Sequence, residues 1–101
     1  MAEVIWTEPA LEQLNDIAEY IALDNFQAAQ NVVQNAFDKV DRLSEFPLSG
    51  RIPPEVPNSI YQEVIVNPCR VFYRLQDGTV YIIHVMRDAQ QLRKHMLGLV
   101  E

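Results

Sequence analysis

Residues 70–87 have the sequence RVFYRLQDGTVYIIHVMR, and this stretch decides the fold. Asp77-Gly78 is a strong signal for a two-residue turn between antiparallel strands. The residues on both sides of the turn are rich in β-branched and aromatic side chains, which favour strands. The sequence therefore predicts a β-hairpin formed by residues 70–76 and 79–86.

The turn also predicts which side chains of the hairpin share a face. Pairing outward from the turn joins Gln76 with Thr79, Arg74 with Tyr81, Phe72 with Ile83, and Arg70 with Val85. Because side chains alternate along a strand, one face carries a mixture of basic and apolar residues: Arg70, Phe72, Arg74, Tyr81, Ile83, Val85 and Arg87. The other face is more continuously apolar and is expected to lie under helices: Val71, Tyr73, Leu75, Val80, Ile82, His84 and Met86.

Arg70 and Arg87 are expected to be diagonal neighbours on the first of these two faces. Two guanidinium groups so close together repel each other unless an anion lies between them. That anion can be an internal carboxylate such as Glu63, or it can belong to a ligand. The sequence leaves both possibilities open.

Upstream of the hairpin, the spacing of apolar residues predicts two helices. Residues 4–6 are typical of a short strand, and Pro9 suits the first turn of the helix that follows. Apolar residues then recur every three or four positions up to Asp24-Asn25. Either of these residues can cap a second helix that continues to Pro47. Two long helices joined by two or three residues must lie antiparallel.

The remaining segments complete the predicted order of elements. Residues 47–59 are rich in proline and form a stiff connector, and residues 60–66 form a third strand of the sheet. Asp88 is expected to cap a terminal helix whose apolar side carries Leu92, Met96, and Leu99 or Val100. The predicted fold class is α+β with the order β-α-α-β-β-β-α, in a single domain spanning residues 1–101.

Length and composition exclude several classes of protein. The chain has 101 residues, of which 49% are hydrophobic, and this is the size of one small domain. Its apolar runs are far shorter than the roughly 20 residues that cross a bilayer, and its first residues lack the pattern of a signal peptide. A single cysteine, Cys69, fits a reducing compartment. We therefore expect a cytoplasmic protein that does not bind a membrane.

The charge distribution limits where an anion can bind. A net charge of −6 argues against a protein whose main task is to grip a nucleic-acid backbone. Residues 1–48 hold nine acids and two bases, whereas residues 49–101 hold five acids and six bases, five of them arginine. Arginine binds carboxylate and phosphate in a bidentate manner. Any anion-binding site is therefore expected in the second half.

The motifs of conventional enzymes are absent from the sequence. There is no glycine-rich phosphate loop, no nucleophile elbow and no regular spacing of metal ligands. We therefore expect neither a cofactor nor a metal. His84 is expected in the core and His95 on the surface, and Cys69 has no obvious base beyond Arg70 that would stabilise its thiolate.

Seven short motifs run through the chain in a characteristic order. They are VIWT at 4–7, ALEQL at 10–14, IAEYI at 17–21, FPLSGR at 46–51, YQEV at 61–64, RVFYR at 70–74 and VYIIHVMR at 80–87. In their order and spacing they resemble the RelE/ParE family of toxins from type II toxin–antitoxin systems. The resemblance covers nearly the whole chain, and it implies a helical hairpin packed on a curved antiparallel β-sheet.

The resemblance implies one of two actions. RelE-like members cut mRNA on the ribosome, and a site of that kind would use Glu63, Arg70, Arg87 and His95. ParE-like members inhibit DNA gyrase, and thereby replication, without known chemistry of their own. The connector at 47–59 has no lysine where RelE-like enzymes place lysines, and the chain is acidic. The ParE-like action, by binding rather than catalysis, is therefore favoured, and a ribosome-dependent mRNA endonuclease is the alternative.

The resemblance also implies partners. The residues expected to bind the target, DNA gyrase, are basic: Arg51, Arg70, Arg74, Arg87 and Arg93. A cognate ParD-like antitoxin is expected to fold its tail into the groove between the helices and the sheet. The residues expected to line that groove are apolar: Leu11, Leu14, Val33, Phe37, Phe72 and Ile83. The complex is expected to bind operator DNA through the antitoxin, which would supply the basic contacts that this chain lacks.

Overall fold

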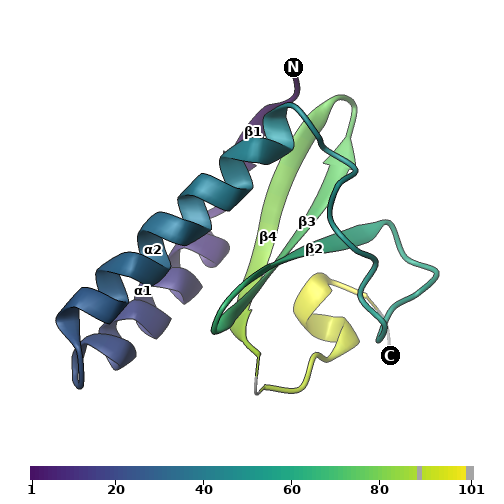
Figure 1. The fold of residues 1–101 in the computed structure, drawn as a ribbon. Coiled ribbons are helices and arrows are strands. Elements are labelled where there is room, and N and C mark those ends of the chain that lie inside the picture. Colours follow the sequence, from purple (N-terminus) through teal and green to yellow (C-terminus); the bar gives the residue numbers. More distant parts are fainter. Residues whose placement is uncertain (89, 100–101) are drawn as a thin grey trace.

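The computed structural model describes residues 1–88 and 90–99, in which two helices pack against one face of a four-stranded sheet (Figure 1). The strands are β1 (Glu3–Trp6), β2 (Tyr61–Val66), β3 (Cys69–Gln76) and β4 (Thr79–Arg87). The helices are α1 (Glu8–Ala22) and α2 (Phe26–Asp41), with short 3-10 helices at Arg42–Ser44 and Lys94–Leu97. Within this described part of the chain, the predicted α+β class, the first two predicted helices and the four strands are confirmed.

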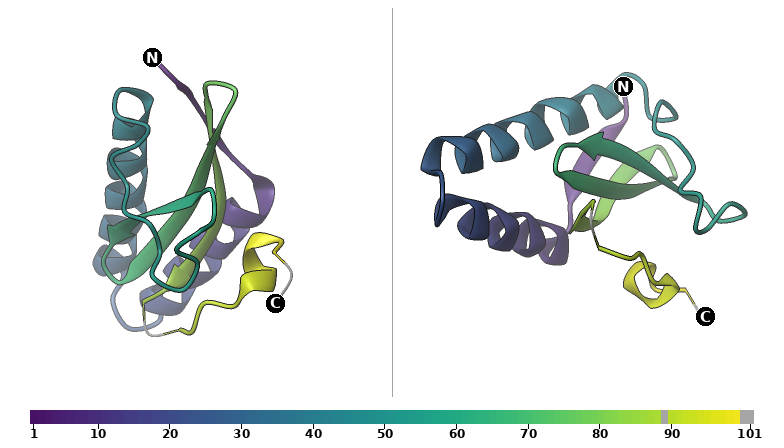
Figure 2. Two further views of the ribbon diagram at one scale, coloured as in Figure 1. Left: turned by 90° about the vertical axis from the view of Figure 1, so that its right-hand side faces the viewer. Right: turned by 60° about the horizontal axis from the view of Figure 1, so that its bottom comes forward.

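The two helices form where the apolar spacing predicts them. Pro9 lies in the first turn of α1, where its missing N–H costs nothing. Thr7 precedes α1, but its hydroxyl donates to the carbonyl of Ile82 at 2.7 Å and so ties the helix start to the sheet. The side chain of Asn25 accepts a hydrogen bond from the N–H of Ala28 at 3.0 Å and caps α2. The helices lie antiparallel and side by side (Figure 2).

The sheet is mixed, with the strand order β1-β4-β3-β2. The pairs β2–β3 and β3–β4 are antiparallel, but β1 runs parallel to β4. The expectation of an antiparallel sheet is therefore wrong for β1. The parallel pairing continues past the strand, where the backbone N–H of Thr7 also donates to the carbonyl of Ile82, at 3.0 Å. Nothing in the four residues of β1 predicts that contact.

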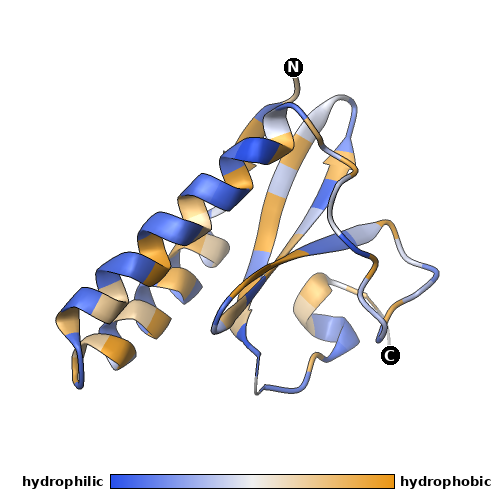
Figure 3. Ribbon diagram, in the orientation of Figure 1, coloured by the Kyte–Doolittle hydropathy of each residue, from blue (hydrophilic) through white to orange (hydrophobic). Residues whose placement is uncertain are grey.

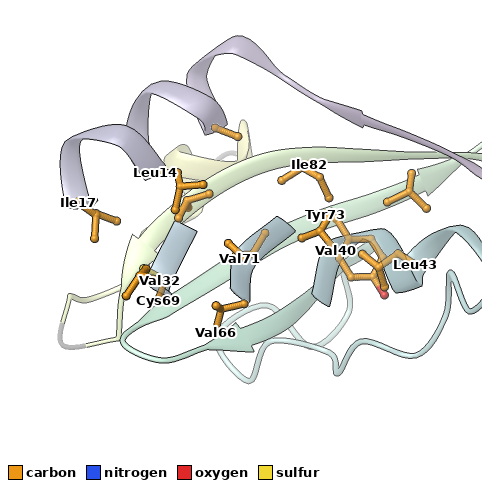
Figure 4. Packing of buried hydrophobic residues seen from close by; sticks show 14 residues of the cluster. Leu14, Ile17, Val32, Val40, Leu43, Val66, Cys69, Val71, Tyr73 and Ile82 are labelled. Atoms are coloured by element: carbon orange, nitrogen blue, oxygen red, sulfur yellow. The ribbon is translucent and has the colours of Figure 1, made fainter. Parts of the chain in front are cut away.

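The main core lies between the helices and the sheet (Figure 4). In Figure 3 hydrophobic and hydrophilic bands alternate along α2, as expected for a helix with one buried face. The buried members of this core come from both helices, from the 3-10 helix Arg42–Ser44 and from three strands: Ala10, Leu14, Ile17, Val32, Ala36, Val40, Leu43, Val66, Cys69, Val71, Tyr73, Val80, Ile82 and Val85. Removing these side chains from water is the main stabilising contribution on this face.

A second, smaller core lies on the opposite face of the sheet. Leu92 and Leu97 of the C-terminal segment cluster there with Phe72 of β3 and Met86 of β4. The hydroxyl of Tyr61 donates to the carbonyl of Leu97 at 2.8 Å and fixes the segment to β2. The C-terminal segment therefore covers part of this face, at the end of the sheet away from the β3–β4 turn (Figure 1).

The predicted terminal α-helix starting at Asp88 is wrong for the described residues. A 3-10 helix, Lys94–Leu97, forms instead. The side chain of Gln90 accepts a hydrogen bond from the N–H of Arg87 at 2.8 Å, so the chain turns directly after β4 rather than coiling. The segment is then held by single apolar side chains on the second core. Val100, one of the predicted apolar residues, lies outside the described residues.

The pairing of β3 with β4 slips by one residue at a β-bulge. From the turn as far as Tyr73 with Ile82, the pairs follow the predicted register. Beyond that point Phe72 pairs with His84, and Ile83 is the extra residue. The predicted pairs of Phe72 with Ile83 and of Arg70 with Val85 are therefore wrong.

The bulge exchanges the two faces of β4 beyond Ile83, because each added residue reverses the alternation of side chains. Val85 therefore packs in the main core, whereas Met86 lies in the second core. His84 pairs with Phe72 and lies on the second-core face, and Arg87 pairs with Cys69 and lies on the helix-covered face. The predicted faces of these four residues of β4 are wrong for this reason.

Candidate functional site

Four charged side chains meet on the face of the sheet opposite the helices, and we call them the Arg70 cluster: Arg51, Glu55, Glu63 and Arg70. The guanidinium of Arg70 donates to both carboxylate oxygens of Glu55, at 2.7 and 2.8 Å. It also donates to Glu63, at 2.6 and 3.3 Å. Glu63 accepts two further contacts from Arg51, at 2.6 and 2.7 Å. Two arginines and two glutamates therefore neutralise each other.

Elements from separate parts of the chain position this cluster. Glu63 of β2 pairs with Phe72 of β3, so its side chain lies diagonally beside that of Arg70 on the same face. An isolated β-bridge between Arg51 and Glu63 holds the start of the connector against the edge of β2. Glu55 lies further along the same connector and completes the cluster from the solvent side.

Arg70 and Glu63 form the inner pair of this cluster, and their burial indicates that they support the fold. The side chain of Arg70 is 6% exposed and that of Glu63 is 0% exposed, whereas Glu55 remains 35% exposed. Hydrogen bonds from Arg70 lower the pKa of Glu55. Hydrogen bonds to Glu55, and then to Glu63, raise the pKa of Arg70. Of the two possibilities that the sequence left open, Arg70 is neutralised by internal carboxylates.

Arg87 is not a neighbour of Arg70. It pairs with Cys69 on the helix-covered face, and its guanidinium lies 4.8 Å from the ring centre of Tyr20 in α1. The expected juxtaposition of Arg70 and Arg87 is therefore wrong, and the bulge at Ile83 is its physical cause. Within residues 1–88 and 90–99, Arg87 forms no ion pair.

The four residues of the expected ribonuclease set do not share one face. Glu63 and Arg70 are in direct contact, but Arg87 lies on the far side of the sheet. His95 is exposed on the 3-10 helix Lys94–Leu97.

The five arginines expected to bind the target divide into two groups. Arg51 and Arg70 are held by Glu63 in the Arg70 cluster. The other three, Arg74, Arg87 and Arg93, form no ion pair within the described part of the chain. Arg74 and Arg87 each lie over a tyrosine ring, and Arg93 is exposed beside a hollow of about 310 Å³ that Glu55 and Leu92 also line.

The six apolar residues expected to receive the antitoxin do not form one exposed groove. Leu14 is buried in the main core and Phe72 in the second core, so the expectation that they are exposed is wrong. Phe37 is half-buried, and its ring centre lies 4.9 Å from that of Trp6. Leu11 is 41% exposed. Ile83 and Val33 are half-buried.

Sequence reasoning missed an apolar groove of about 400 Å³ between the outer faces of α1 and α2. Its lining is dominated by small or apolar residues: Ala18, Ala22, Phe26, Ala29 and Val33, with Glu19, Gln30 and Gln34. Phe26 is largely exposed there. The signal that could have found the groove is the position of Phe26 away from the buried stripe of its helix.

Two further residues have environments that oppose reactivity. Cys69 is buried in the main core, and desolvation raises the pKa of its thiol, which keeps it protonated. His84 is buried, and desolvation lowers the pKa of its imidazole, so the neutral form is favoured. Its ring centre lies 5.9 Å from that of Phe72. His84 is therefore a packed side chain, although on the opposite face from the one expected.

Comparison with known proteins places the chain in a class of toxins. Residues 4–92 match the family described as the ParE toxin of the type II toxin–antitoxin system parDE. The chain belongs to this ParE toxin family. Its first half and its hairpin, including the β3 arginines, fall within the matched region.

Two relatives are named as toxins, and one solved structure belongs to a ParDE system. The chain is 32% identical over 90 residues to a protein named Toxin RelE2 from Caulobacter vibrioides, covering 89% of this chain and 99% of the relative. It is 36% identical over 86 residues to a protein named Putative toxin Y4kP from Sinorhizobium fredii, covering 85% and 88%. A solved structure titled as a chromosomal ParDE toxin–antitoxin system from P. aeruginosa superposes with a TM-score of 0.69. The two sequences are 25% identical, and the match covers 86% of this chain and 96% of that one.

Proposed function

We propose that this chain is a ParE-like toxin that binds DNA gyrase, blocks replication and arrests growth, and that a cognate ParD-like antitoxin neutralises it. Membership of the ParE toxin family supports the toxin class and the existence of an antitoxin. The family alone does not separate gyrase inhibition from cleavage of mRNA, since one relative carries the name Toxin RelE2.

One observation carries the proposal that the chain acts by binding. Cleavage of RNA at the 2′-hydroxyl needs an acid and a base, together with cations that hold the phosphate. Arg70, which would be such a cation, is enclosed by Glu55 and Glu63, and Arg87 lies on the other face of the sheet. An incoming phosphate would have to displace two carboxylates from Arg70. This arrangement supports a toxin that recognises a protein surface.

Operator DNA, the membrane and the cellular location remain to be considered. A net charge of −6 supports operator binding only through the antitoxin, which would supply the basic contacts. The helices of the described residues are too short or too polar to cross a membrane. We place the protein in the cytoplasm, where its target acts.

The test measures both activities on the same purified chain. We expect inhibition of DNA supercoiling by purified gyrase, accumulation of cleaved DNA, and induction of the DNA-damage response on expression. We expect no codon-dependent cuts in mRNA in a translating extract. Cuts in mRNA with unaffected supercoiling would overturn the gyrase proposal in favour of the RelE-like endonuclease.

A further inference from the structure

One row of side chains crosses all four strands on the face opposite the helices. Direct register pairs join Ile5 of β1 to Tyr81 of β4, Tyr81 to Arg74 of β3, and Arg74 to Tyr61 of β2. Tyr61 is buried and holds Leu97 of the C-terminal segment. The other three side chains lie closer to β1 and remain partly exposed. We call Ile5, Tyr81 and Arg74 the Arg74 surface.

The C-terminal segment covers the opposite end of this face. Its anchors, Leu92 and Leu97, cluster with Phe72 and Met86, which lie further from the β3–β4 turn than Arg74 does. Figure 1 shows the 3-10 helix near the end of the strands away from that turn. Ile5, beside Tyr81, stays 37% exposed.

Arg74 lacks a charged partner among the described residues. Its guanidinium lies 5.4 Å from the ring centre of Tyr81, and its Nε is buried with no hydrogen-bond partner. No residue in 1–88 or 90–99 forms an ion pair with it. The other β3 arginine, Arg70, is bound by two carboxylates on the same face. A partly exposed guanidinium that stacks on an aromatic ring and forms no ion pair is suited to bind a carboxylate.

The composition of the Arg74 surface matches the centre of a protein interface. Arginine and tyrosine are enriched among residues that dominate binding energy. The next row towards the turn is polar, because Glu3 pairs with Thr79 and Thr79 with Gln76. An apolar and cationic centre with a polar rim on one side is the usual anatomy of a docking surface.

We propose that the Arg74 surface docks an acidic segment of the toxin's target, in which a carboxylate binds the guanidinium of Arg74 and an adjacent apolar side chain covers Tyr81 and Ile5. The carboxylate would supply the counter-charge that Arg74 lacks within residues 1–88 and 90–99. A second copy that docked through the same surface is a poor occupant, because it would bring two Arg74 guanidinium groups together, and like charges repel. The proposal rests on the function proposed above and adds the place and chemistry of the target contact.

The experiment compares Arg74→Met, which keeps an apolar stem, with Tyr81→Ser and with the control Arg42→Met. Arg42 is exposed, and its replacement by Met removes the same charge at a site away from the Arg74 surface. Growth arrest on induction, inhibition of DNA supercoiling by purified gyrase, the unfolding midpoint, binding of the cognate antitoxin and sedimentation are measured for each variant. We expect Arg74→Met and Tyr81→Ser to lose potency about 30-fold, while Arg42→Met retains it. We also expect Arg74→Met to unfold at an equal or higher temperature, since it removes an unfilled buried donor.

Three results would overturn the proposal that the Arg74 surface binds the target. Full growth arrest by Arg74→Met would show that the guanidinium does not contact the target. A lower unfolding midpoint together with lost antitoxin binding would show that Arg74 only supports the fold. Self-association of the wild-type chain that Arg74→Met abolishes would assign the surface to a second copy.

A fourth result separates this proposal from the proposed function. Growth arrest that depends on Arg74 without inhibition of gyrase would contradict gyrase as the target but would still support the Arg74 surface as the contact site.

Discussion

The side-chain oxygen of Gln13 accepts a hydrogen bond from the backbone N–H of Val85 at 2.8 Å, although the two residues are 72 positions apart. Val85 comes two residues after Ile83, the extra residue of the bulge in β4. The contact therefore joins α1 to the point at which the sheet changes register. That register determines that Arg70 and Arg87 lie on opposite faces.

Replacing Gln13 by Leu removes the acceptor for a buried N–H. We expect the free energy of unfolding to fall by about 1–3 kcal/mol, the usual cost of an unsatisfied buried donor. Gln13→Glu keeps an acceptor oxygen and should lie close to the wild type. Gln27→Leu, at an exposed site where the side chain binds Asn31, is the control, and it should change stability by no more than about 0.5 kcal/mol. Urea denaturation measures the free energy of unfolding of each variant. Equal stability of Gln13→Leu and the wild type would refute the role of this contact.

Glu63 is the buried centre of the Arg70 cluster, so its charge should be essential for folding. Glu63→Gln leaves Arg51 and Arg70 facing an uncharged amide. Breaking a buried ion pair from one side costs about 3–5 kcal/mol. Glu45→Gln, on an exposed carboxylate, is the matched control. Guanidinium denaturation measures the difference, and a loss no greater than that of the control would show that the cluster does not stabilise the fold.

Glu55 should contribute to the acid sensitivity of the protein. Its pKa is lowered from 4.5 in the folded chain, chiefly by hydrogen bonds from Arg70. The unfolded state therefore binds a proton at higher pH than the folded state does, and stability is lost as the pH falls below 4.5 through the folded pKa. Glu55→Gln should lose less stability than the wild type over this window, as measured by the unfolding midpoint against pH. Parallel curves for the two proteins would contradict the expected linkage.

Gly50 lies where no side chain fits. A Cβ at this position would meet the hydroxyl oxygen of Tyr73 at 2.5 Å and the carbonyl oxygen of Glu63 at 2.8 Å. The hydroxyl cannot move away freely, because it donates to the carbonyl of Pro47 and accepts from the N–H of Gly50, both at 2.9 Å. We expect Gly50→Ala to cost about 1–3 kcal/mol by overpacking. Ser49→Ala, next to it and exposed, is the control in thermal unfolding, and equal midpoints would contradict the predicted clash.

The elements that local sequence encodes could be predicted, and those that depend on distant contacts could not. Apolar spacing gave both helices, and Asn25 gave the start of α2. The Asp77-Gly78 turn gave the hairpin, since both residues adopt the positive φ angles that such a turn requires. The bulge at Ile83 depends instead on packing and on a partner in α1. One added residue was enough to reverse the predicted faces of the end of β4.

The candidate site was predicted in part for the same reason. The sequence predicts Glu63 as a possible partner of Arg70, because neighbouring strands can bring the two together. Glu55 was missed, because it lies on a connector whose path is set by Pro53 and Val56, both buried against the rest of the chain, and not by regular pairing. The lack of a partner for Arg74 could not be read from the sequence, because an absence of contacts is a property of the packed structure.

Arg70 and Arg87, which the sequence predicts to be neighbours, should differ in how much stability the chain loses when each is replaced by Met. Arg70→Met leaves the carboxylates of Glu63 and Glu55 without their main partner, and we expect it to cost about 3–5 kcal/mol. Arg87→Met removes a contact with the exposed ring of Tyr20, worth about 0.5–1 kcal/mol. Growth arrest by Arg70→Met should therefore fall with the folded fraction and recover at lower temperature. Arg87→Met should stay folded, so a loss of its growth arrest would mean that Arg87 contacts the target, as the sequence predicts. Equal unfolding midpoints for the two variants would show that burial of the Arg70 cluster does not separate their roles.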